Sequence, residues 1–159
     1  MKMIIQRILA ISAVIVLSLV LNYATTQDII SVEAGQIGFQ VLLIIYLIQL
    51  VVFLVSFILK TEHYYDLTGG ITYITVIVFT LYQKQLLGTL DFRSILLGVL
   101  ILVWAMRLSS FLFLRIKKAG KDRRFDKIKT NFTRFMLAWA LQGFWVFMCT
   151  LPAITAIAS

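Results

Sequence analysis

Few side chains in this sequence could take part in chemistry, and most of them stand close together. Glu62, His63 and Asp66 could act as acids or bases. Tyr65 could polarise a carbonyl for hydride addition, as phenols do in reductive sites, and so could Tyr73. Packing is the favoured role of each tyrosine and chemistry the alternative, because charged and aromatic residues are also typical of membrane interfaces. A lone histidine with no second histidine or cysteine nearby predicts no metal site.

A second group of polar side chains could bind a ligand rather than react with it. Lys121, Arg123 and Arg124 suit the phosphates of a cofactor and equally suit anionic lipid headgroups, because these cations pair with phosphate oxygens. Asp122, a candidate for the same cofactor site, is expected to organise this loop by pairing with neighbouring arginines. The sequence has no glycine-rich dinucleotide fingerprint and no nucleophile elbow.

The composition places these groups on a membrane protein. The chain has 159 residues, of which 61% are hydrophobic, and a soluble domain of this size would have to expose much of that surface. Nine of the 15 basic residues lie within residues 115–134, between two apolar runs. Retention of a positive loop in the cytoplasm explains this block better than a nucleic-acid site does. The expected partners are therefore membrane lipids, with anionic headgroups at residues 115–134, and no nucleic acid.

Five apolar runs predict the fold class, an all-α, polytopic membrane helix bundle that forms one domain. Asp66 and Thr68 are expected to cap the third helix near Gly69. The predicted spans are residues 4–21, 37–59, 70–87, 94–114 and 132–157.

The loop charges predict the orientation of this bundle. Residues 115–131 form a basic loop that should stay in the cytoplasm, together with the amino terminus. Lys84 and Arg93 are the only loop charges that disagree, and they are too few to reverse the order. A bacterial inner membrane is favoured, and an endoplasmic reticulum membrane is the alternative, because both keep positive loops on the cytosolic side.

One polar contact between spans is expected at depth. Arg107 lies inside the fourth apolar run and Gln142 lies inside the fifth, at a similar distance from the basic loop. An arginine at this depth should face the bundle or extend toward the headgroups. If the two helices pack side by side, Arg107 and Gln142 could share a polar network, and both are candidates for a cofactor site.

Three stretches carry a resemblance to a known family. They read YYDLTGGITYITV from Tyr64, WAMRLSSFLFLRIKKAGKDRRFDKIK from Trp104, and LQGFWVFMCTLPA from Leu141. In this order and spacing they resemble the amino-terminal part of the steroid 5-alpha-reductase-like membrane proteins, in the branch catalogued as a domain of unknown function. The matching positions are Tyr65 to Gly69, Arg107, Leu108, Arg115, Gly120, Asp122, Arg124, Phe125, Gln142, Trp145, Leu151 and Pro152.

The resemblance implies a relative of NADPH-dependent reductases, which pass hydride to a carbon–carbon double bond of a steroid-like or isoprenoid lipid. In that family an Arg-His-Pro-Asn-Tyr type motif lies further along and helps to form the cofactor pocket. This sequence reaches Ser159 without the motif. We therefore expect a partial or non-catalytic relative, with NADPH as its cofactor by resemblance only. The alternatives are a membrane module that binds a lipid or a partner helix without catalysis, and, ranked lowest, a transporter component.

Overall fold

The protein is an antiparallel bundle of five long helices, seen here in a computed structural model that describes residues 2–27, 32–119 and 122–158. The described part contains no strand, which confirms the all-α prediction. The helices are α1 (Lys2–Gln27), α2 (Val32–Ile58), α3 (Tyr64–Leu86), α4 (Phe92–Ala119) and α5 (Phe132–Ala158), and a short 3-10 turn, η1 (Arg123–Phe125), lies between the last two.

Four of the five helices, α1, α2, α4 and α5, are long and apolar enough to cross a membrane. The chain is thus an integral membrane protein. Helix α3 has 23 residues and a more polar composition, and its buried residues include Thr68, Thr72 and Thr80. Each of these threonines donates a hydrogen bond to the backbone carbonyl four residues earlier, so its polarity is satisfied within the helix.

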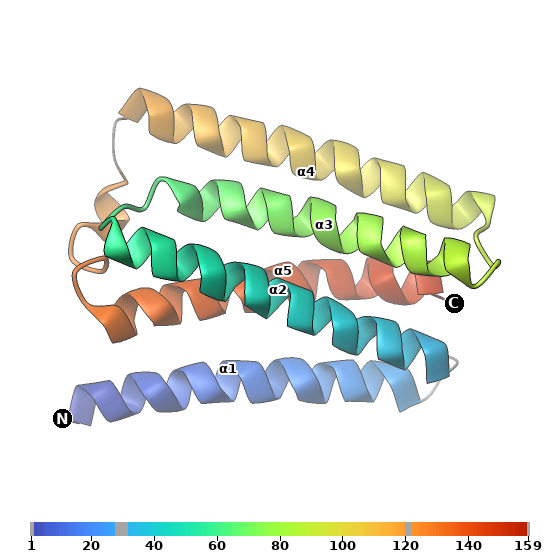
Figure 1. The fold of residues 1–159 in the computed structure, drawn as a ribbon, viewed down its shortest axis with the longest axis horizontal. Coiled ribbons are helices and arrows are strands. Elements are labelled where there is room, and N and C mark those ends of the chain that lie inside the picture. The colour runs from blue at the N-terminus through green and yellow to red at the C-terminus, as the bar shows by residue number, and fades with distance from the viewer. Residues whose placement is uncertain (1, 28–31, 120–121, 159) are drawn as a thin grey trace.

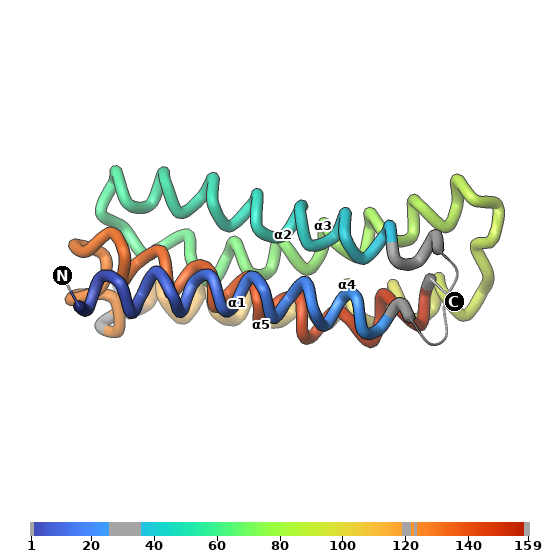
Figure 2. The backbone as a smooth tube through the Cα atoms, turned by 90° about the horizontal axis from the view of Figure 1, so that it is seen from below, coloured from blue at the N-terminus to red at the C-terminus, as the bar shows by residue number. Residues whose placement is uncertain are grey.

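The helices form two layers, and α5 belongs to the second of them. Figure 2 shows α2 and α3 on one side and α1, α5 and α4 on the other. Helix α5 contacts all four other helices, whereas α1 packs against α2 and α5 alone within the described residues. The buried side chains with the largest volumes include Trp139, Phe135 and Phe147 of α5 and Phe53 of α2. The core therefore lies along α5.

Local signals explain where the helices begin and end. The carbonyls of the last turn of α3 are satisfied around Gly88, which has φ +68°, and those of α2 around Lys60, which has φ +52°. Asp91 accepts a hydrogen bond from the Ser94 N–H at 3.0 Å and caps α4. Asn131 caps α5 in the same way, accepting from the Arg134 N–H at 3.1 Å.

The expected cap of α3 by Asp66 and Thr68 is wrong. The helix begins at Tyr64, several residues earlier, so both side chains lie inside its first turns. Thr68 donates back to the Tyr64 carbonyl, and the Asp66 carboxylate pairs with arginines instead. Because the helices continue through polar interface residues, the apolar runs marked their central parts and not their ends.

The order of the helices places the amino terminus and the basic block of residues 115–134 at the same end of the bundle. In Figure 1 the amino terminus, the α2–α3 connection and the α4–α5 connection lie at one end of the bundle, and the carboxyl end of α5 lies at the other. Arg7 reaches from α1 to Asn131 Oδ1 at 3.0 Å, within the first of these ends. The basic block and the amino terminus are therefore on the same side, as the charge pattern requires.

Cysteine labelling would test the predicted orientation. In a Cys149→Ala background, a cysteine at Lys127 should resist a membrane-impermeant thiol reagent added to intact cells, whereas a cysteine at Thr89 should react. Both positions are on connections between helices, at opposite ends of the bundle. Labelling at Lys127 with protection at Thr89 would reverse the orientation.

Candidate functional site

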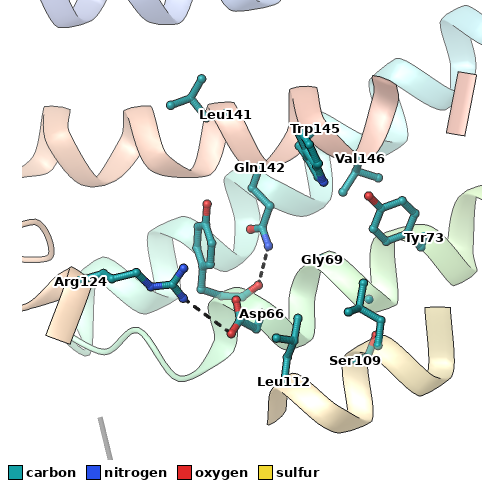
Figure 3. A pocket seen from close by; sticks show the side chains of 13 residues that line it. Asp66, Gly69, Tyr73, Ser109, Leu112, Arg124, Leu141, Gln142, Trp145 and Val146 are labelled. Carbon is teal, nitrogen blue, oxygen red and sulfur yellow. Dashed lines mark hydrogen bonds and ion pairs between the residues drawn. The ribbon is translucent and has the colours of Figure 1, made fainter. Parts of the chain in front are cut away.

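A pocket of about 340 Å³, called the main pocket below, lies where α3, α4 and α5 meet near the basic end of the bundle (Figure 3). Its wall along α5 is open to the surroundings, since Trp145 is 68% exposed. The lining residues come from α3 (Tyr65, Asp66, Gly69, Gly70, Tyr73), α4 (Leu108, Ser109, Leu112), η1 (Arg124) and α5 (Leu141, Gln142, Trp145, Val146).

Two adjacent glycines shape the floor of the main pocket. A Cβ atom at Gly70 would lie 1.6 Å from Ser109 Oγ and 2.4 Å from Ser109 Cβ, so the backbone of α3 packs directly against the Ser109 side chain of α4 at this point. A Cβ atom at Gly69 would lie 2.7 Å from Gln142 Nε2. Because these positions carry no side chain, the other residues can surround a cavity without filling it.

The polar end of the main pocket is a network of two carboxylates and two guanidiniums. Arg115 contacts Asp66 Oδ2 at 3.4 Å, and Arg124 lies 4.0 Å from the same oxygen. Arg124 Nε also donates to Asp122 Oδ1 at 2.9 Å, and its NH2 group pairs with Asp122 Oδ2. Asp122 thus organises the loop, as the sequence predicted. Among these four residues the positive and negative charges balance.

The pKa values of the Asp66 and Asp122 carboxyls shift in opposite directions because their surroundings differ. Burial raises the pKa of Asp66, and the nearby Arg124 and Arg115 only partly oppose this shift. Hydrogen bonds from Arg124 lower the pKa of Asp122 despite its partial burial. The same contact raises the pKa of Arg124, so this guanidinium stays charged.

Arg124 is held at the pocket by an anchored loop. Glu62, which is 2% exposed, accepts a hydrogen bond from Lys129 Nζ at 2.6 Å and another from the Asp122 N–H at 3.2 Å. Burial opposes ionisation of Glu62, but these hydrogen bonds outweigh it and lower its pKa. On the other side of Arg124, the buried Phe125 ring packs against the Tyr65 ring, with the two ring centroids 4.8 Å apart. The loop is therefore fixed on both sides of Arg124.

The two candidate tyrosines lie in different situations. The Tyr65 hydroxyl donates to the Ala138 carbonyl at 2.9 Å, and burial, with the charge of Asp66, raises its pKa to about 12. Tyr73 is 5% exposed, and its hydroxyl is buried without a hydrogen-bond partner in the described structure. Cys149 lies close enough to interact with this hydroxyl, but sulfur is a weak hydrogen-bond partner. Tyr73 is therefore the tyrosine available to a ligand.

Gln142 and Arg107 are not brought together. Gln142 Nε2 donates to the Tyr65 carbonyl at 2.8 Å, and its Oε1 is buried without a partner among the described residues. Arg107 is exposed and is not among the residues that line the main pocket. Ala105 and Ser109 are the buried face of α4, and a residue two positions after Ala105 is rotated by about 200° from it. The rotation of α4 therefore turns Arg107 outward.

Of the remaining predicted binding residues, Lys121 and the Arg123 side chain lie outside the described residues. Sequence reasoning missed the roles of Glu62, Arg115 and Gly70. The signal for Gly70 was present, because paired glycines inside an apolar helical pattern indicate close backbone approach. Nothing in the spacing linked Glu62 to Lys129, which is 67 residues away.

These features define a class: a helical integral membrane protein with a pocket that is polar at one end and apolar along its open wall. The family model described as "Protein of unknown function (DUF1295)" matches residues 52–159, and the chain belongs to this family. The match contains every residue that lines the main pocket and the stretches that carry the resemblance described above. No curated protein and no solved structure shows a significant match.

Proposed function

We propose that the main pocket binds a neutral amphiphilic lipid. Its apolar body would lie against Leu108, Leu112 and Trp145, with one oxygen at the Tyr73 hydroxyl, and its polar end would face Asp66 and Arg124. The observation that carries this proposal is the buried, unpartnered hydroxyl of Tyr73, a residue that lines a cavity with an open, apolar wall. A buried hydroxyl without a partner costs about 1–3 kcal/mol, which a ligand oxygen would recover.

The charge balance supports a neutral ligand rather than an anionic one. Both guanidiniums at the polar end are already paired with carboxylates. An anionic headgroup would have to displace Asp66 or Asp122 from these pairs and would leave a carboxylate near it without its cation. A hydroxyl or carbonyl group can bind there without breaking an ion pair.

NADPH, the cofactor that the resemblance implies, does not fit the polar end of the main pocket. Its phosphates need cationic groups that are free to pair with them. Arg115 and Arg124 are committed to Asp66 and Asp122. No catalytic step is therefore assigned to this cofactor.

A reductive role is the second candidate, and one observation favours it. The Tyr73 hydroxyl is the kind of donor that polarises a carbonyl when hydride adds to a conjugated lipid. In this proposal the chain would supply the lipid side of a steroid 5-alpha-reductase-like site. The Tyr65 hydroxyl is less suitable because it is already bound to the Ala138 carbonyl.

Photolabelling would test lipid binding. A long-chain ketone that carries a diazirine should label residues 141–146 of the protein in lipid nanodiscs, and the matching carboxylate should label them less. Tyr73→Phe should reduce ketone labelling about fivefold, the equivalent of one hydrogen bond of about 1 kcal/mol. The variant should keep its thermal stability, because it loses an unpartnered hydroxyl. Equal labelling of Tyr73→Phe and the wild type, or preference for the carboxylate, would contradict the proposal.

A further inference from the structure

A second cavity, called the α1 cavity below, lies on the other side of α5. Its volume is about 160 Å³, and it lies between α1, α2 and α5, with Ile11, Tyr46, Gln49, Met136 and Trp139 among its lining residues. None of these side chains lines the main pocket. The two cavities are therefore separate sites that share α5 as a wall.

The α1 cavity is almost wholly apolar, but two of its lining side chains are buried polar groups with unused hydrogen-bonding capacity. Gln49 is 2% exposed; its Nε2 donates to Thr72 Oγ1 at 3.3 Å, while its Oε1 has no partner in the described structure. Trp139 is 1% exposed, and its Nε1–H has no partner there either. By contrast, the Tyr46 hydroxyl is satisfied by Ser18 Oγ at 2.7 Å. One acceptor and one donor thus remain unused on two residues that line this apolar space.

The depth of the α1 cavity restricts what can satisfy these two atoms. Trp139 lies seven residues from the start of α5, and Gln49 lies nine residues from the end of α2, which correspond to about 10 and 14 Å along the helices. These depths fall within a hydrocarbon layer of about 30 Å, below the headgroups and ester groups of phospholipids. A ligand that arrives there must be mainly apolar. Both Ile15 and Leu50, at the outer side of the cavity, are exposed and allow entry from the bilayer.

We propose that the α1 cavity is a second lipid site, which takes the hydroxyl-bearing ring end of an apolar alcohol from the bilayer interior. A hydroxyl is the smallest group that can donate to Gln49 Oε1 and accept from Trp139 Nε1–H. The volume suits a six-carbon ring, since an apolar cavity of about 150 Å³ accommodates benzene. This site does not depend on the lipid proposed for the main pocket.

A single-tryptophan reporter tests this site. The double variant Trp104→Phe, Trp145→Phe leaves Trp139 as the reporter, and a bromine atom that enters the cavity would quench its fluorescence. The probes are 4-bromocyclohexanol and bromocyclohexane, added to the protein in nanodiscs. The matched control retains Trp104 alone, because this exposed residue lines neither cavity and reports the concentration of each probe in the bilayer.

At equal bilayer concentrations, the alcohol should quench Trp139 saturably, with a half-saturating concentration about tenfold below that of bromocyclohexane. Gln49→Leu should remove this preference. Ile11→Phe, which fills the cavity from α1 and leaves both polar groups unchanged, should abolish saturable quenching while the helical content stays constant. Equal half-saturation for the two probes, an unchanged preference in Gln49→Leu, or no saturable quenching in the reporter protein would overturn the proposal.

Discussion

Replacing Lys129 with methionine is expected to lower the free energy of unfolding by about 3 kcal/mol, because the buried Glu62 carboxylate would lose its cation. The loop that carries Arg124 would lose its anchor at the same time. Unfolding in mixed micelles, followed by tryptophan fluorescence, measures this change. Lys127→Met is the matched control, since Lys127 is exposed in the same loop and its replacement should cost less than about 0.5 kcal/mol.

The pH dependence identifies the cause of this loss. In the wild-type protein the pKa of Glu62 is below its ordinary value of 4.5, so its stabilisation is complete above that pH and disappears as the pH falls through the lowered pKa. Without Lys129, burial should raise this pKa. The difference between wild type and variant should therefore be largest near neutral pH and should shrink in acid. A difference that does not change with pH would exclude the ion pair as the cause.

Gly70→Ala is expected to lower the free energy of unfolding by about 2 kcal/mol, despite the higher helix propensity of alanine. The new Cβ would overlap Ser109 Oγ and Cβ, so α3 and α4 would have to separate along their contact. Lipid binding in the main pocket should weaken as well, because Gly70 and Ser109 both line it.

Two further variants show whether this contact is responsible. Gly69→Ala meets only the end of the flexible Gln142 side chain and should cost less than Gly70→Ala. Adding Ser109→Gly to Gly70→Ala should restore much of the lost stability, because it removes both overlapping atoms. Equal losses for Gly69→Ala and Gly70→Ala, with no recovery in the double variant, would contradict the close approach of α3 and α4.

Much of the fold could be predicted from the sequence, because hydrophobicity dominates in a membrane. The five apolar runs correspond to the five helices. The connection that carries the basic block lies at the same end of the bundle as the amino terminus, as the loop charges predicted. The helix ends could not be predicted to the residue. The third helix was expected to begin near Gly69, but α3 begins at Tyr64, since Asp66 finds cationic partners there and Thr68 bonds to its own helix.

The candidate site could be predicted only in part. Tyr65, Tyr73, Arg124 and Gln142 were chosen from residue type, and all four line the main pocket. Their partners depend on helix rotation, which composition does not determine. The network between Arg107 and Gln142 was wrong for this reason, whereas Asp66 meets Arg115 across a gap of 49 residues.

The central place of α5 has a consequence for how the protein is made. This helix walls both cavities, yet it is the last of the five to leave the ribosome. Until α5 inserts, the polar side chains of Gln49 and Tyr73 are not covered by the α5 residues that later separate them from lipid. The first four helices should therefore remain beside the insertion machinery, or bind a chaperone, until the fifth packs against them.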